Sequence, residues 1–330
     1  MFFPFNFLCL SCLFLSVMIV ISSTSWYTAW VGLELNLLSF LPLILTSKMN
    51  LSFSEASMKY FLVQALSSVL LLFGSLMSSY SAYALVLVFF ALMLKLAAAP
   101  FHFWVISIVE MMSWTSVFLL FTIQKIAPLV LLFSTFVVYE TSLLALLFII
   151  FSAVIGSIGG LSQCMLRSMM GYSSINHMSW LLSSLYVSRE LMESYFILYI
   201  LVLLPMIILF LNSSFFHVSQ LSHIMFSSKK VLSFFCLLSL GGLPPFLGFL
   251  PKWIVINKLV EIHMLMLILF LVFMALITLY YYLRLTYSSF MISSSSVFSL
   301  NLTTGAYPVS FWFFSMVSLM SLPVCVFIFT

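Results

Sequence analysis

Four ionisable residues stand apart from the other charges of this sequence. Glu34 and Lys125 are each the single charge of an apolar run long enough to cross a membrane, and Lys95 and Lys252 stand alone beside proline-containing segments. Burial favours the neutral forms of lysine and glutamate, so both can exchange a proton near neutral pH. Hydrolysis would instead require an activated nucleophile or a metal cage. The four residues therefore predict a proton relay.

Two other roles are open for these charges. A charge at the bilayer centre costs between about 2.5 and more than 10 kcal/mol, so each one needs hydration, a partner or a function. The long side chains of Lys95, Lys125 and Lys252 could instead extend from helix ends to the interface. Glu34 has a shorter stem and could take part in a purely structural buried ion pair.

Two further residues lie beside Lys95 and are candidate members of the relay. His102 follows Pro100, and its imidazole titrates near neutral pH, so it could connect Lys95 to its neighbours. A structural histidine at a helix break is the alternative. Glu110 lies a few residues further on and is the acid that we expect at a channel mouth.

The composition shows which elements must position these residues. Of the 330 residues, 65% are apolar and only 5% are charged, whereas a soluble protein carries roughly 25% charge. The chain is therefore expected to be an all-α integral membrane protein with about eleven transmembrane helices. The predicted spans are about 5–22, 26–46, 56–78, 82–110, 116–137, 142–163, 171–187, 193–212, 231–256, 262–283 and 308–329.

Two of the predicted spans, 82–110 and 231–256, are interrupted by proline and glycine. Proline removes helix hydrogen bonds, and broken helices are tolerated at membrane depth only where they line an interior path. Broken helices in corresponding halves indicate an antiporter-like architecture of inverted repeats. We expect one polytopic domain over 1–330, with halves at about 26–137 and 142–285 and a C-terminal helix at about 308–329.

Charge distribution excludes several functions and orients the chain. The net charge of +4 is too small and scattered for nucleic-acid binding, and no GxGxxG or GxxxxGK[ST] pattern occurs. Basic residues gather on one side of the predicted spans, which should be the side of synthesis and hold the N-terminus. With eleven spans the C-terminus lies opposite. The basic residues of that side are Lys48, Arg167, Lys229, Lys230 and Arg284.

Seven strings in order between about residues 25 and 285 closely resemble the subunit 2 family of animal mitochondrial NADH:ubiquinone oxidoreductase, complex I. They are WVGLELNLLSFLPLI (30–44), EASMKYFLVQ (55–64), LKLAAAPFHFWV (94–105), QKIAPL (124–129), GSIGGLSQCMLR (156–167), GYSSINHMSW (171–180) and LSLGGLPPFLGFLPKW (238–253). The first 24 residues and the tail match only in composition.

The resemblance implies a core subunit of the membrane arm, in the mitochondrial inner membrane, with its N-terminus on the matrix side and its C-terminus on the intermembrane-space side. By motif position it pairs Glu34 with Lys95, makes Lys125 the central relay, and places Lys252 toward the intermembrane space or the next subunit. NADH, FMN, iron–sulfur clusters and ubiquinone then belong to other subunits, and this chain binds no cofactor or metal. Its implied partners are core and accessory membrane-arm subunits and lipids, not a soluble homo-oligomer.

Two rival functions remain open at this point. A free-standing cation/proton antiporter shares this kind of fold, and it would be active without any larger complex. A scaffold subunit would space the membrane arm without carrying protons. Neutralising Glu34 or Lys252 would then alter assembly only.

Overall fold

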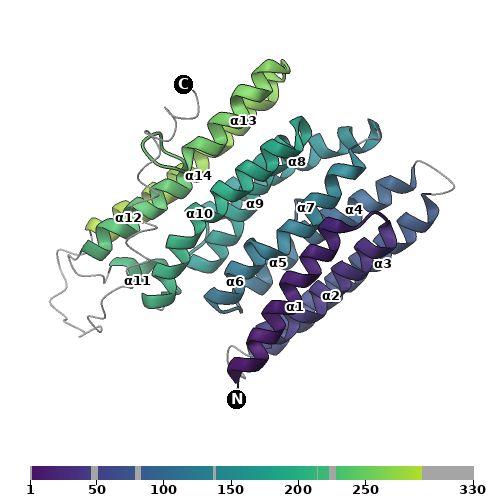
Figure 1. Cartoon of the computed structure of the whole chain (residues 1–330). Coiled ribbons are helices and arrows are strands. Elements are labelled where there is room, and N and C mark those ends of the chain that lie inside the picture. Colours follow the sequence, from purple (N-terminus) through teal and green to yellow (C-terminus); the bar gives the residue numbers. More distant parts are fainter. Residues whose placement is uncertain are drawn as a thin grey trace. The chain divides into compact units, whose positions relative to one another are not determined.

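The computed structural model describes residues 2–45, 51–78, 83–136, 139–213, 215–222 and 228–291. Within these ranges every regular element is a helix (Figure 1). The chain divides into two compact units, Met1–Ser152 and Ala153–Thr330, and each is described by itself. The predicted C-terminal helix at about 308–329 lies outside the described residues.

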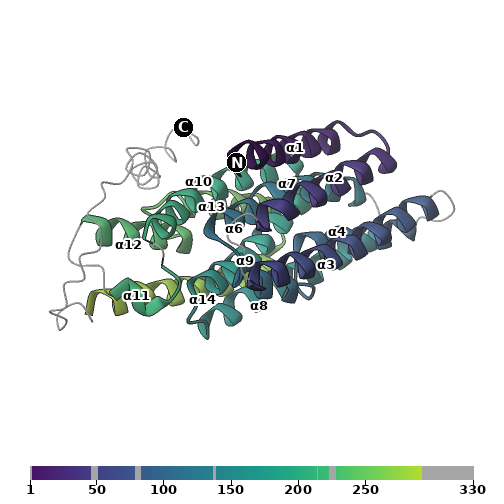
Figure 2. The ribbon, with the colours of Figure 1, turned by 90° about the horizontal axis from the view of Figure 1, so that it is seen from below.

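The first unit is built from helices that pack against their neighbours in sequence. The helices are α1 (Phe2–Ser22), α2 (Trp26–Leu45), α3 (Leu51–Met77), α4 (Ala84–Leu96), α5 (Phe103–Val109), α6 (Trp114–Phe121), α7 (Ile123–Thr135) and the first part of α8 (Tyr139–Leu161). Figures 1 and 2 show α1 beside α2 and α3 beside α4. Helix α7 contacts α1, α2 and α4, so it is an interior helix of this unit.

Aromatic side chains fill the core around the end of α4. Phe89 and Phe90 of α4 lie 5.6 and 5.9 Å from the ring of Phe148 on α8. Phe101, which follows α4, lies 5.8 Å from the same ring. Tilted and edge-on rings at these distances pack favourably. The alanines that begin the segment after α4 are therefore buried in the core of its own unit, whereas Pro100 is exposed.

The second unit contains the rest of α8 and six further helices. They are α9 (Leu166–Val187), α10 (Arg189–Ser213), α11 (Val218–Ser222), α12 (Ser228–Gly241), α13 (Phe249–Glu261) and α14 (Leu265–Met291). Helix α9 contacts α10, α13 and α14 and is buried along most of its length. Its serines donate hydrogen bonds to carbonyls one turn earlier, for example Ser173 to Met170 and Ser179 to Asn176. A polar helix can thus lie in an apolar interior.

Seven segments of the described ranges are long and apolar enough to cross a membrane. They are Phe5–Ser22, Trp26–Leu45, Leu51–Met77, Trp114–Thr135, Thr141–Leu161, Arg189–Asn212 and Leu265–Tyr287. The number differs from the eleven expected for three reasons. Each predicted span at 82–110 and 231–256 is divided into two shorter helices, α9 is too polar, and 308–329 is not described.

Candidate functional site

The carbonyl groups at the end of α4 accept hydrogen bonds from residues between α4 and α5 and from α5 itself. Ala97 adopts a left-handed conformation with φ of 55°, and its N–H donates to the Leu94 carbonyl at 3.2 Å. The indole of Trp104 on α5 donates to the same carbonyl at 3.1 Å. A left-handed residue after a helix commonly closes its last turn in this way. The side chain of Lys95 is therefore not needed to cap α4.

Lys95 lies in the last turn of α4 and is only 7% exposed. The negative end of the helix dipole favours a cation at this position. Its ammonium interacts electrostatically with the half-buried Glu34 of α2. Within the described part of the chain, these two groups interact without a direct salt bridge. Glu34 and Lys95 thus lie in the same unit within electrostatic range of each other, and their pairing stays a prediction.

The two accessory candidates occupy the ends of α5. His102 is buried at the start of the helix, where its Nδ1 lies 3.1 Å from the Pro100 carbonyl oxygen and its ring lies 4.1 Å from that of Phe103. This backbone contact within the interruption supports a structural role. Glu110 follows the last residue of α5 and is half-buried. Its involvement in a channel stays a prediction.

Lys125 lies beside an interruption that the sequence analysis did not foresee. Helix α6 ends at Phe121, and α7 begins at Ile123, because Thr122 leaves the helical conformation with φ of −112° and ψ of −83°. The Thr122 hydroxyl donates to the Phe118 carbonyl at 2.7 Å, and Pro128 removes the donor that would bond to the Gln124 carbonyl. The predicted span at 116–137 is therefore also divided.

The side chain of Lys125 extends from the first turn of α7 into the core of the first unit. It is 5% exposed, and its Nζ lies 5.6 Å from the centre of the Phe121 ring. An aromatic face stabilises an ammonium electrostatically, and more so where water is scarce. The Phe121 ring thus offsets part of the cost of burying the Lys125 ammonium.

A chain of uncharged side chains joins three helices next to Lys125. The Tyr60 hydroxyl of α3 donates to Gln124 Oε1 at 3.0 Å, and Gln124 Nε2 donates to Asn36 Oδ1 of α2 at 2.9 Å. Tyr60, Gln124 and Asn36 were not predicted from the sequence as site residues. Their available signal was an uncharged polar residue within an apolar run close to each isolated charge, Asn36 beside Glu34 and Gln124 beside Lys125.

The second unit presents a lysine at the segment between α12 and α13. Lys252 lies in the first turn of α13, is 5% exposed, and donates from Nζ to the Gly241 carbonyl oxygen at 3.0 Å. This carbonyl belongs to the last residue of α12, where the helix dipole favours a cation. Gly242 follows with φ of 82°, a conformation that glycine adopts without steric cost.

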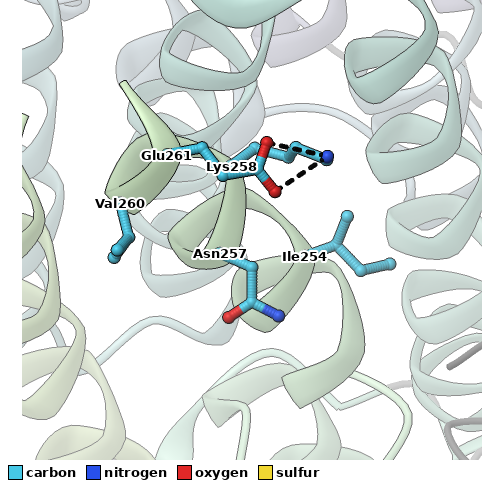
Figure 3. Close-up of a pocket in the computed structure, with 5 residues that line it drawn as sticks. All are labelled: Ile254, Asn257, Lys258, Val260 and Glu261. Carbon is cyan, nitrogen blue, oxygen red and sulfur yellow. Dashed lines mark hydrogen bonds and ion pairs between the residues drawn. The ribbon is translucent and has the colours of Figure 1, made fainter. Parts of the chain in front are cut away.

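A surface pocket on α13 lies apart from these groups (Figure 3). It is lined by Ile254, Asn257, Lys258, Val260 and Glu261, none of which is a predicted site residue. Lys258 and Glu261 form an exposed ion pair of 2.9 Å, as their spacing on one helix allows. In the described ranges no group of three His, Cys, Asp or Glu residues could hold a metal ion.

Comparison with known proteins gives consistent matches over most of the chain. The family described as NADH:quinone oxidoreductase/Mrp antiporter matches residues 23–85 and 76–278. NADH-ubiquinone oxidoreductase chain 2 of Anopheles gambiae is 44% identical over 292 residues, which cover 85% of this chain and 84% of that protein. The protein of the same name from Equus asinus is 39% identical over 289 residues, covering 84% and 83%.

Solved structures show the same fold at lower identity. A chain of respiratory complex I from Thermus thermophilus, solved with bound aureothin, matches with a TM-score of 0.83 and 22% identity over 98% of this chain and 79% of its own length. A chain of the Mrp complex from Dietzia matches with a TM-score of 0.73 and 19% identity over 82% of this chain and 57% of its own. The helices described above therefore have an antiporter-like arrangement.

Proposed function

This chain belongs to the NADH:quinone oxidoreductase/Mrp antiporter family, and we propose that it is the chain 2 subunit of mitochondrial NADH:ubiquinone oxidoreductase, complex I. It is an integral protein of the inner mitochondrial membrane in this proposal, and it is a subunit of a proton-translocating enzyme. Identities of 37–44% to proteins named as chain 2 support the assignment.

Proton translocation through this chain rests on one structural observation. Each of the three lysines isolated by the sequence is at least nine-tenths buried, and each lies within one turn of an interruption between helices. Buried ionisable groups at irregular backbone are typical of proton and ion paths in membranes. The three lysines, together with Glu34, are therefore assigned to a proton relay.

The interruptions support the fuller architecture that the sequence predicts. Helix α4 has 13 residues and is roughly 20 Å long, which is too short for a hydrocarbon core of about 30 Å. We assign α4 with α5, and α12 with α13, to two broken membrane-crossing helices. With α9 and the C-terminal segment as further spans, the chain crosses eleven times, and its N-terminus lies on the matrix side and its C-terminus on the intermembrane-space side. At least one such helix in each unit supports an inverted repeat.

The proposed mechanism begins with a change of charge near Glu34 when quinone is reduced in another subunit. A negative charge arriving there favours a proton on Glu34 and weakens the attraction of that carboxylate for the Lys95 ammonium. Lys95 then releases its proton more readily, and Lys125 passes protons on within the first unit. Lys252 is the proton site of the second unit. Redox chemistry with NADH, FMN, iron–sulfur clusters and ubiquinone takes place in other subunits, and core and accessory membrane-arm subunits and lipids surround this chain.

The test is Lys125→Met in the assembled enzyme, with Lys59→Met as the control. Lys59 is an exposed lysine of the same unit, paired with Glu55 on its own helix. We expect Lys125→Met to assemble and to pump fewer protons per NADH in inner-membrane vesicles, whereas Lys59→Met pumps normally. An assembled Lys125→Met enzyme with an unchanged pumping ratio would contradict the role of Lys125.

The second candidate function is a free-standing cation/proton antiporter, which the Mrp-like fold favours. A native gel of detergent-solubilised mitochondrial membranes, stained for NADH oxidation and probed for this chain, separates the two. Migration in the large NADH-oxidising band supports the complex I subunit. Migration as a small separate species supports the antiporter. Normal pumping by every assembled variant of the relay residues would instead indicate a scaffold.

A further inference from the structure

Gln124 holds together three helices of the first unit through one side chain. Its amide oxygen accepts a hydrogen bond from Tyr60 of α3, and its amide nitrogen donates one to Asn36 of α2. Gln124 itself is the second residue of α7, directly after the interruption at Thr122. The start of α7 is thereby connected to α2 and α3.

The chemistry of the amide suits this position. A glutamine accepts at its oxygen and donates at its nitrogen at the same time, and it neither gains nor loses a proton in the physiological range. Tyr60 and Asn36 are buried, so a lost partner leaves a polar atom without water. The hydrogen bonds of Gln124 with Tyr60 and Asn36 can thus hold the helices in register, while these side chains do not themselves carry protons.

The backbone of Gln124 gains little support from its own helix. Pro128 has no N–H to donate to the Gln124 carbonyl, and Thr122 departs from helical geometry on the other side. Together with the packing of α7, the side-chain bonds to α2 and α3 therefore hold this turn in place. Lys125 is the next residue, so any shift of this turn moves the Lys125 ammonium relative to α2 and α3. Helix α2 also carries Glu34.

We propose that Gln124 is a positioning residue, which fixes Lys125 in the proton path through its hydrogen bonds to Tyr60 and Asn36. This inference rests on the proton-translocating function proposed above. Movement of α2 near Glu34 is transmitted to the turn that bears Lys125 through Asn36 and Gln124. The three uncharged residues thus couple the first proton site to the second.

The experiment measures protons pumped per NADH in inner-membrane vesicles that contain Gln124→Leu, Tyr60→Phe or both. Tyr60→Phe removes only the hydroxyl and keeps the ring contacts with Phe40 and Trp104, at 5.1 and 6.1 Å. Tyr27→Phe on the exposed face of α2 is the matched control. The amount of assembled enzyme is measured on native gels for each variant.

We expect pumping to fall about fivefold in Gln124→Leu and about twofold in Tyr60→Phe, as the loss of one or two hydrogen bonds suggests. The double variant should resemble Gln124→Leu, because Tyr60 acts through Gln124. The control and the assembled amounts should not change. Additive losses in the double variant would overturn the proposal.

Two further outcomes separate this proposal from the one on which it rests. Normal pumping by assembled Gln124→Leu, with impaired pumping by Lys125→Met, overturns the positioning role alone. Normal pumping by assembled Lys125→Met overturns the proposed relay. If Gln124→Leu does not assemble, Tyr60→Phe decides, and its unchanged pumping ratio overturns the positioning role.

Discussion

The interruptions that hold Lys95 and Lys252 solve the same electrostatic problem in different ways. At the first, the last turn of α4 is capped by backbone N–H groups and the Trp104 indole, so the Lys95 ammonium can interact with Glu34 on another helix. At the second, the Lys252 ammonium itself donates to the last carbonyl of α12. One lysine lies within electrostatic range of an ionisable group, and the other contacts a fixed dipole.

Because of this difference, we expect the charge of Lys95 to be switched by its neighbour, whereas the Lys252 ammonium is anchored to a helix end. The charge on Glu34 can change, so the stabilisation of the Lys95 ammonium can change with it. The Gly241 carbonyl cannot change its charge, and it favours the protonated form of Lys252 whenever the two are in contact. We therefore expect Lys95 to respond to events on α2, whereas release from Lys252 requires its hydrogen bond to Gly241 to break.

The largest effect on stability is expected at Gly248, where two parts of the backbone of the second interruption approach each other most closely. A Cβ at Gly248 would overlap the Ser239 carbonyl oxygen, and rigid backbone cannot move aside as a flexible side chain can. Gly248→Ala should destabilise the chain by about 3 kcal/mol or more and remove the assembled subunit from native gels. The control is Gly171→Ala in α9, where a Cβ meets nothing within 4 Å. Normal assembly of Gly248→Ala would show that the second interruption is more adaptable than its close backbone contact indicates.

The next effect compares the two lysines directly. Lys95→Met and Lys252→Met should each lower proton-coupled turnover about tenfold or more, because each removes a group that transfers protons. Both lose the same buried ammonium, but only Lys252→Met leaves a helix carbonyl without its donor. Lys252→Met should therefore be less stable than Lys95→Met by about 1–2 kcal/mol, as measured by thermal denaturation of the purified enzyme. Equal stability would argue against an anchoring role for Lys252.

A smaller effect tests whether Glu34 acts through Lys95 alone. Glu34→Gln should lower proton-coupled turnover about fivefold, and adding Lys95→Met should reduce it no further than Lys95→Met does by itself. Combining Glu34→Gln with Lys252→Met should give a further loss. Glu55→Gln, which removes the acid of an exposed helical ion pair, is the control and should have no effect on turnover. If Glu34→Gln adds its full loss to Lys95→Met, the two residues do not act as a pair.

Parts of this comparison could be predicted from the sequence because their signals are local. Isolated charges in apolar runs marked the lysines, proline marked the first interruption, and proline with glycine marked the second. Glu55 and Lys59 lie four residues apart on one helix and form an ion pair of 2.6 Å, as that spacing allows. Each of these signals lies within a few residues of the feature that it predicts, so hydropathy and helix geometry were sufficient.

Other parts could not be predicted because their causes are tertiary or weak. The partners of Gln124 are 64 and 88 residues away in the sequence, and no local pattern connects them. The interruption at Thr122 has only a threonine bond to the preceding turn and a proline six residues later as its signals. Many helices tolerate each of these features separately. The threonine and the proline produce an interruption here in the context of the packing of α7 against α1, α2 and α4.

The smallest effect concerns the cap that leaves Lys95 free to face Glu34. Trp104→Phe keeps an aromatic ring but removes the indole donor to the Leu94 carbonyl, and it should lower thermal stability by about 1 kcal/mol. Trp30→Phe is the matched control, because its buried Nε1 has no hydrogen-bond partner among the described residues. With the indole absent, the Leu94 carbonyl keeps only the Ala97 N–H as donor, and we expect the Lys95 ammonium in the same turn to be drawn toward it. Proton-coupled turnover in Trp104→Phe should then depend less on Glu34. If adding Glu34→Gln to Trp104→Phe still lowers turnover fivefold, the indole does not decide which partner Lys95 takes.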